Sequence, residues 1–220
     1  NDEERYLMRH IEDLARTASS RGIARYSGFL SDREQQLAQA ALNRTDMPED
    51  EIRFDGGWPG AERKLLCLEP VDSYPASPLC CVRLQCRALP GAQLPVHKDY
   101  LGSLMGLELR REALGDIVLP EDQLGVAYVF ALEPAAELIC QELRQAGHTD
   151  LTAEMQPLET LPAFPQAERP RQTATVSSLR LDAVLAAMLR CSRGMAAELV
   201  TAGRVEINHL PAESVHAPVY

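Results

Sequence analysis

The most constraining feature of this chain is a helical periodicity near its C-terminus, in residues 180–208. Apolar side chains recur there three and four positions apart: Leu181, Val184, Leu185, Met188 and Leu189. This spacing predicts one apolar stripe along an amphipathic helix. Because so short a helix buries little surface by itself, we interpret the segment as a small module whose role lies in the surface that it presents.

A second helix is predicted almost immediately after the first, with Ala196, Leu199 and Val200 on its apolar face. Ser192 is placed to cap it, because the hydroxyl can accept a backbone N–H that the first helical turn cannot pair. Gly203 is expected to end the helix in the left-handed conformation. The residues that follow alternate as a strand and run into the turn-prone Asn208.

Arginines stand at the ends of these predicted elements: Arg180, Arg190, Arg193 and Arg204. A guanidinium can bind phosphate oxygens bidentately, and a helix N-terminus adds backbone N–H groups. We expect Arg193 to project toward a phosphate, so its replacement by glutamate should weaken RNA binding and leave the fold intact. From Gln172 onward four acidic residues balance the four arginines, and the whole chain has a net charge of −10. Any RNA contact must therefore be local.

These residues resemble the S-four RNA-binding domain, which is named for a small-subunit ribosomal protein. The pattern is carried by Arg180, Leu181, Asp182, Leu185, Ala186, Ser192, Arg193, Ala196 or Ala197, Gly203, Val205 and Asn208. The resemblance implies an RNA-binding surface made by Arg180, Arg190, Ser192, Arg193, Arg204, Asn208 and His209. His209 stands where the family usually has glycine, and the sequence stops before the family's closing strands. We therefore expect it to be a piece of a slightly longer protein.

Asp182 has two other interpretations. It can cap its helix or pair with a nearby arginine, which would make it purely structural. The Arg-Leu-Asp sequence also surrounds the catalytic aspartate of pseudouridine synthases, in which case Asp182 would be a nucleophile. Asp182 opens a helix inside the S-four pattern, however, and the chain contains no large catalytic domain around it. We therefore expect no catalytic residue and no enzyme.

The middle of the chain predicts strands and helices in the order β-α-β-β-α-β. The segments are 79–88, 97–109, 116–119, 125–132, 134–145 and 148–155. This split βαβ order predicts a ferredoxin-like antiparallel sheet with both helices on one face and the other face free, in an α+β chain. Tyr128 and Phe130 share one side of a strand, so they either stack bases, as in RNA-recognition modules, or face the core.

The N-terminal region is predicted to be helical and mixed. A helix over 3–17 is followed by a turn and by a second helix that starts at Ser31, where Glu34 completes a capping box, and runs to about Leu42. A short strand is expected at 52–54. Residues 55–64 then contain three glycines, but a strand-to-strand connection lacks the helix N-terminus of a phosphate cradle, so we expect a tight turn over Trp58.

The helix predicted over 97–109 supplies the second group of RNA-binding candidates. They are Lys98, Arg110 and Arg111, although arginines at a helix C-terminus also have a structural reason in the helix dipole. Gly102 and Gly106 lie four residues apart, and we expect them to allow close packing against a neighbouring element.

The remaining composition points to no metal and no cofactor. No pair among the six cysteines has C-x-x-C spacing, so we expect small buried thiols, and the five histidines are scattered. No apolar run is long enough to span a membrane and no signal peptide is evident, so we expect a cytoplasmic protein with no membrane partner.

Several segments together resemble the YlmH family of S-four proteins. They are 56–64, 97–117, 127–137 and the C-terminal module. The resemblance implies a cytoplasmic, non-enzymatic protein that binds ribosomal RNA and tRNA on the large ribosomal subunit during rescue of stalled translation, with genes near cell-division genes. We expect a monomer. The alternatives are an RNA-modifying enzyme and a cell-division adaptor.

We expect four regions. They are the N-terminal region 1–64, the ferredoxin-like domain 65–156, a stiff proline-rich linker 157–171 and the S-four-like domain 172–220.

Overall fold

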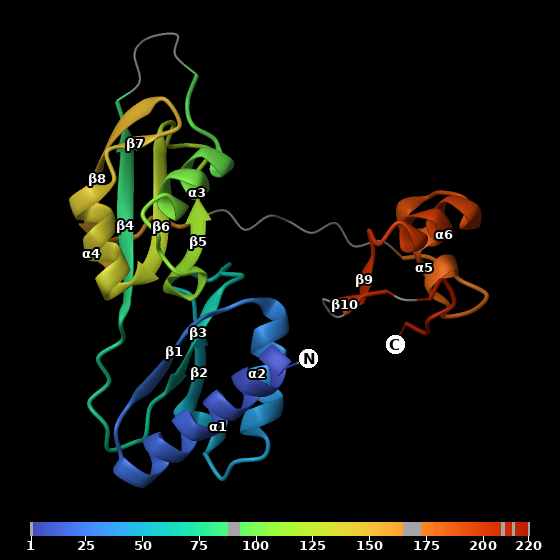
Figure 1. Cartoon of the computed structure of the whole chain (residues 1–220), viewed down its shortest axis with the longest axis horizontal. Helices are drawn as coiled ribbons and strands as arrows, with labels where there is room; N and C mark the ends of the chain where they lie inside the picture. Colours follow the sequence, from blue (N-terminus) through green and yellow to red (C-terminus); the bar gives the residue numbers. More distant parts are fainter. Residues whose placement is uncertain (1, 88–92, 165–172, 208–209, 213, 220) are drawn as a thin grey trace. The chain divides into compact units, whose positions relative to one another are not determined.

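The computed structural model describes residues 2–87, 93–164, 173–207, 210–212 and 214–219. It divides into two compact units, Asn1–Gln166 and Ala167–Tyr220, which are described separately here (Figure 1). Both units mix helices and strands, so the predicted α+β class is confirmed.

The first unit begins with two helices on a three-stranded sheet. The helices are α1 (Asp2–Arg21) and α2 (Asp32–Leu42), and the antiparallel strands lie in the order β1 (Arg25–Leu30), β3 (Lys64–Leu68), β2 (Ile52–Asp55), with a short 3-10 helix, η1 (Glu49–Glu51), before β2. Both helices share a core with one face of this sheet, which includes Ile11, Ala38, Leu66 and Leu68. The predicted capping box is confirmed, because Ser31 N donates to Glu34 Oε2 at 2.7 Å and Glu34 N to Ser31 Oγ at 3.4 Å.

The strand β1 was not predicted, because only a turn was expected after the first helix. Gly28 interrupts its apolar pattern, but this glycine is needed for close packing. A Cβ built on Gly28 would lie 2.8 Å from the Cβ of Glu112. Residues 65–68, which had been assigned to the middle domain, belong to β3, and β3 pairs with β1 and β2.

The rest of the first unit is a five-stranded antiparallel sheet in the order β5-β6-β4-β8-β7. In chain order the elements are β4 (Leu79–Cys86), α3 (His97–Met105), η2 (Arg111–Ala113), β5 (Leu114–Val118), β6 (Val126–Leu132), α4 (Glu133–Glu142), β7 (Gln145–Ala146) and β8 (Thr149–Gln156). The predicted β-α-β-β-α-β order and antiparallel pairing are confirmed, and β7 is a short addition around Gly147, whose φ is +58°. Both helices pack on one face, because Tyr100 and Ile139 lie in the same core as Val82 and Val129.

The other face of this sheet had been predicted to be free. In the structure it is covered. Tyr128 and Phe130 are 4% and 0% exposed and pack with Phe29 and Leu65 from the three-stranded sheet. Two rings that are closed to solvent cannot stack on RNA bases. The base-stacking interpretation is therefore wrong, and its alternative, that these rings face the core, is confirmed.

Phe164 completes this second core from within the predicted linker. Its ring lies edge-on to Tyr128, with centroids 5.0 Å apart, and to Trp58 at 5.6 Å. The segment before it forms a short 3-10 helix, η3 (Leu158–Thr160), and packs on the same core. The first half of the predicted linker is thus part of the first unit, and residues 165–171 lie outside the described residues.

The second unit contains the two predicted helices, α5 (Leu181–Leu189) and α6 (Arg193–Thr201), and a hairpin of β9 (Glu206–Ile207) and β10 (Leu210–Pro211). Its small core includes Leu181, Ala196 and Val200. The last described residues run past the start of α5, where Leu181 N donates to Ala217 O at 2.9 Å and Asp182 N to Val215 O at 3.1 Å. These bonds satisfy N–H groups that a helix start leaves unpaired.

The position of Phe164 gives a prediction for stability. Phe164→Ala should lower the free energy of unfolding of the first unit by about 3 kcal/mol, because it leaves a cavity between two sheets. Urea unfolding can be followed by the fluorescence of Trp58, the only tryptophan of the chain. The control is Leu124→Ala, since Leu124 is 80% exposed. Equal midpoints for the two variants would show that Phe164 does not hold this core together.

Candidate nucleic-acid interface

The connection between α5 and α6 forms an exposed tip of the second unit. Arg190 ends α5 in the left-handed conformation, with φ 52° and ψ 43°, and its N–H donates to Ala186 O. Glycine is the usual residue there, because the left-handed conformation crowds the Cβ of any other residue. The backbone of Arg190 is therefore strained. An arginine at this position does not indicate such a geometry, so it was not predicted. Arg190 is exposed and makes no ion pair with any described residue.

The start of α6 has the cap that the sequence predicted. Ser192 Oγ accepts from Met195 N at 3.2 Å. The first N–H groups of a helix have no intrahelical partner, and those of Arg193 and Gly194 lie at this start. A Cβ built on Gly194 would meet only Ser192 Oγ, at 3.8 Å, so the side-chain position of Gly194 is uncrowded. Open N–H groups at a helix N-terminus favour an anion.

Asp182 lies behind this tip and contacts two of the candidate arginines. Its Oδ1 and Oδ2 accept from Arg180 Nε and Nη2, both at 3.1 Å, and Oδ2 also accepts from Arg193 Nη2 at 2.8 Å. Its side chain is only 8% exposed. The expectation that Asp182 pairs with a nearby arginine is therefore confirmed. A carboxylate covered by two guanidiniums is also poorly placed to act as a nucleophile.

The charges around Asp182 also set its protonation. The hydrogen bond from Arg180 lowers the pKa of Asp182 most, burial opposes this effect by raising the pKa, and Arg193 lowers it further. The net direction is downward, so the carboxylate stays ionised and keeps both partners. Arg180 Nη2 additionally contacts Nδ1 of His216, which ties it to the last described residues.

The other candidates in this unit are less closely grouped in sequence. Arg204 is exposed just after Gly203, whose φ of +67° confirms the predicted left-handed helix end, and forms no ion pair within the described part of the chain. Asn208 and His209 lie outside the described residues.

The predicted apolar stripe of α5 is buried only at its start. Leu181 is 4% exposed, whereas Met188 and Leu189 are 59% and 54% exposed, and Met195 on α6 is 55% exposed. The two-helix unit is too small to cover the end of its own stripe. The tip therefore combines aliphatic side chains with arginines.

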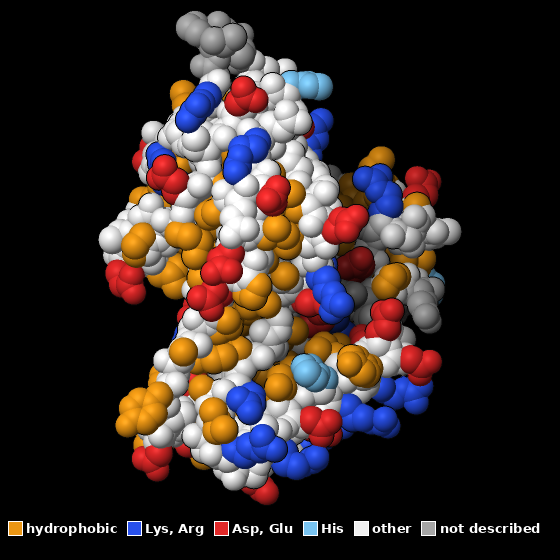
Figure 2. Space-filling model, turned by 60° about the vertical axis from the view of Figure 1, so that its left-hand side comes forward, with side chains coloured by type: hydrophobic (Ala, Val, Ile, Leu, Met, Phe, Trp, Pro, Cys, Tyr) orange, Lys and Arg blue, Asp and Glu red, His pale blue; other side chains and the backbone are white. Residues whose placement is uncertain are grey.

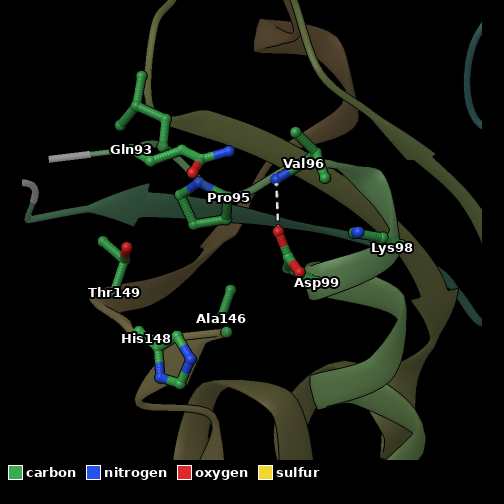
Figure 3. A pocket seen from close by; sticks show the side chains of 10 residues that line it. Gln93, Pro95, Val96, Lys98, Asp99, Ala146, His148 and Thr149 are labelled. Atoms are coloured by element: carbon green, nitrogen blue, oxygen red, sulfur yellow. Dashed lines mark hydrogen bonds between the residues drawn. The ribbon is translucent and has the colours of Figure 1, made fainter.

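The candidates on the middle domain are placed differently. Arg110 and Arg111 follow α3 and are exposed, and Lys98 lies in its first turn, beside a hollow of about 450 Å³ (Figure 3). Residues of the α3 start and of the β7–β8 turn line this hollow. Asp99 Oδ2 accepts from Val96 N at 2.9 Å, so a carboxylate already occupies this helix start and disfavours a phosphate. The expected packing role of Gly102 is wrong, because a Cβ there would meet nothing within 4 Å.

The glycine-rich connection between β2 and β3 is structural, as predicted. Asp116 on β5 accepts from Trp58 Nε1 at 3.2 Å, from Glu62 N at 2.8 Å and from Arg63 N at 3.1 Å. The Arg63 guanidinium donates to backbone carbonyls of Leu114, Phe29 and Arg111. Its donors are used within the fold, so this loop offers no phosphate cradle.

Two family profiles match the chain. The S4 domain matches residues 179–219, and a profile described as "Putative RNA-binding domain in YlmH" matches residues 93–160. The chain is also 32% identical over 209 residues to "Ribosome-associated protein quality control protein P2" of Bacillus subtilis (strain 168), covering 94% of this chain and 78% of that protein. The chain belongs to the YlmH family of S-four proteins. The resemblance read from the sequence is thereby confirmed.

A solved structure supports the fold of this YlmH family member. "Cell division protein ylmH from Streptococcus pneumoniae" superimposes with a TM-score of 0.55 at 13% identity, over 72% of this chain and 94% of that one. At this identity the likeness concerns the fold alone.

The thiols of this YlmH family member are free. Cys67, Cys81 and Cys86 are buried as expected, whereas Cys80, Cys140 and Cys191 are only partly buried. Burial raises the pKa of Cys67 and of Cys81 to about 12, so neither is a ready nucleophile. The described residues contain no group of three or more His, Cys, Asp or Glu side chains suited to a metal. None of the described helices is long and apolar enough to cross a membrane.

The Asp182 contacts predict a pH dependence. A lowered folded-state pKa means that this carboxylate stabilises the second unit above the ordinary aspartate pKa and that the contribution is lost as the pH falls below about 4. In a carboxyl NMR titration, Arg180→Met should raise the Asp182 midpoint, because it removes the largest lowering contact. Arg204→Met, which removes an exposed arginine with no contact to Asp182, should leave it unchanged. Equal shifts in both variants would mean that the arginines act only through bulk charge.

Proposed function

We propose that this protein is a non-enzymatic, ribosome-associated RNA-binding protein whose second unit contacts RNA through the α5–α6 tip. The observation that carries the proposal is that the capped start of α6 and two exposed arginines, Arg190 and Arg193, fall within four residues of one another. This combination binds a phosphate from several directions. The match to the S4 domain supports RNA as the source of that phosphate.

The choice of the ribosome as the partner rests on the relative. The Bacillus subtilis protein is named for ribosome-associated quality control, and we extend that role to this chain. We further propose ribosomal RNA and tRNA on the large ribosomal subunit as the RNA partners, in a cytoplasmic protein that acts as a monomer. Arg180, Arg190, Ser192, Arg193, Arg204, Asn208 and His209 remain the proposed primary contacts. Lys98, Arg110 and Arg111 are proposed secondary contacts.

Local rather than overall charge must attract the RNA. The chain has a net charge of −10, and Figure 2 shows acidic and basic side chains intermixed over most of the visible face of the first unit. At the α5–α6 tip, by contrast, Asp182 is turned inward and the two arginines are exposed. The aliphatic side chains of Met188, Leu189 and Met195 can pack on ribose or bases beside a bound phosphate.

The alternatives receive less support. Neither matching profile nor the Bacillus subtilis protein belongs to an enzyme family, and Asp182 is engaged by two arginines. A cell-division adaptor is favoured by no contact among the described residues. Only the name of the Streptococcus pneumoniae protein points that way.

Arg193→Glu is no longer the cleanest test of the RNA contact. Arg193 donates to Asp182, so a glutamate there would face a buried carboxylate and disturb the fold together with any RNA contact. The earlier expectation that the fold would survive this change ignored the pairing. Arg190 has no such partner among the described residues and can be changed without this complication.

The prediction is that Arg190→Gly separates stability from binding. Glycine relieves the left-handed backbone, so the free energy of unfolding of the second unit should rise by about 1 kcal/mol. Binding to purified ribosomal RNA should weaken by about 1 kcal/mol, with a shallower dependence of log affinity on log salt, because one phosphate contact is lost. Hydrogen exchange of the α5 amides measures the first effect, and a salt titration of binding measures the second.

Glu108→Gly is the matched control. Glu108 is the other described non-glycine residue with positive φ, at 57°, and lies in the first unit. Its replacement relieves the same kind of strain without touching the tip, so RNA binding should not weaken. If Arg190→Gly binds ribosomal RNA as tightly as the wild type, with the same salt dependence, the tip is not the RNA contact.

A further inference from the structure

Asp182 is almost closed to solvent, yet it contacts Arg180 and also Arg193, one of the two arginines of the proposed phosphate site. We propose that Asp182 is a positioning residue, which holds the Arg193 guanidinium in its RNA-binding orientation without itself meeting RNA. This inference rests on the proposed function. From its charge alone, Asp182 would be expected to repel RNA. The proposal instead gives this negatively charged side chain a role that favours RNA binding.

The contacts of the two arginines are unequal. Arg180 donates to Asp182 through both Nε and Nη2, whereas Arg193 donates through Nη2 alone. A guanidinium has five N–H donors, so Arg193 keeps most of its donors for another acceptor. Its side chain is 52% exposed, and that of Arg180 is 43% exposed. Arg193 is therefore the arginine that can contact RNA, and Arg180 holds the Asp182 carboxylate in place.

The Asp182–Arg180 pair is also held by contacts with the last described residues. Asp182 N donates to Val215 O, and Arg180 contacts His216, so the carboxylate and its first arginine are both held by the last described residues. A free arginine side chain loses much rotamer freedom when it binds a ligand. Because Asp182 already orders the Arg193 side chain, this side chain loses less rotamer freedom on binding RNA. Such preorganisation favours binding.

Two effects of Asp182 on RNA affinity have opposite signs. Its charge repels a nearby phosphate, so removing the charge should tighten binding if charge were all that mattered. Loss of preorganisation should weaken binding. The sign of the change therefore decides between the two accounts.

The experiment measures the affinity of the full chain for purified ribosomal RNA over a range of salt concentrations. Asp182→Asn should weaken binding about 5- to 10-fold and flatten the salt dependence, although it makes the protein less acidic. The matched control is Glu198→Gln, which removes the same charge from an exposed site on α6 and should leave binding equal or tighter. A gain in affinity for Asp182→Asn would overturn the proposal.

Arg193→Met supplies the second arm of the test. In a variant that lacks the guanidinium, Asp182→Asn should cause no further loss, because there is nothing left to position. An equal loss in both backgrounds would mean that Asp182 acts only on the fold, and would overturn the proposal.

Asp182→Glu keeps the charge and displaces the carboxylate by one methylene. This variant also tests the positioning role if Asp182→Asn does not fold. It should weaken binding, and unchanged binding would overturn the proposal. Failure of the proposed function looks different: Arg190→Gly would then also leave RNA binding unchanged.

Discussion

The burial of two aromatic rings decides how the first unit is built. Tyr128 and Phe130 project from the side of the five-stranded sheet that its own helices do not cover, and they pack with Phe29 and with Phe164. An apolar sheet face must be covered by another layer, and here the three-stranded sheet and residues 158–164 cover it. The face on which related sheet folds stack bases is therefore used for packing.

With this sheet face closed, the proposed primary RNA contacts lie outside the sheet, on the second unit. Its helices are too short to bury their whole apolar stripe, so Met188, Leu189 and Met195 stay exposed beside arginines and a helix N-terminus. From Gln172 onward the four arginines are balanced by four acidic residues, so net charge does not attract RNA to this part of the chain. The proposed RNA affinity of this unit therefore depends on geometry, and the buried Asp182 carboxylate contacts both Arg180 and Arg193.

Much of this was predictable where the signal was local. The capping box at Ser31, the cap at Ser192, the helix end at Gly203 and the strand order of the middle domain all follow from neighbouring residues in the chain, and all are confirmed. The errors concern contacts between distant segments. Local patterns do not say which layer packs on which. That packing decides the covering of Tyr128, the position of Phe164 and the pairing of β3. Arg190 is a separate case, because its residue type does not favour the left-handed conformation that it adopts. The Asp182–Arg193 pair, eleven residues apart, appeared only as one alternative.

The central claim is that RNA lies against the α5–α6 tip and not against the aromatic sheet face. Ultraviolet crosslinking of the full chain to ribosomes, followed by mass spectrometry of the crosslinked peptides, tests it most directly. The account predicts nucleotide adducts in the peptides that contain residues 188–204, and none on Tyr128 or Phe130. Adducts on those two rings, with an unmodified α5–α6 tip, would contradict it.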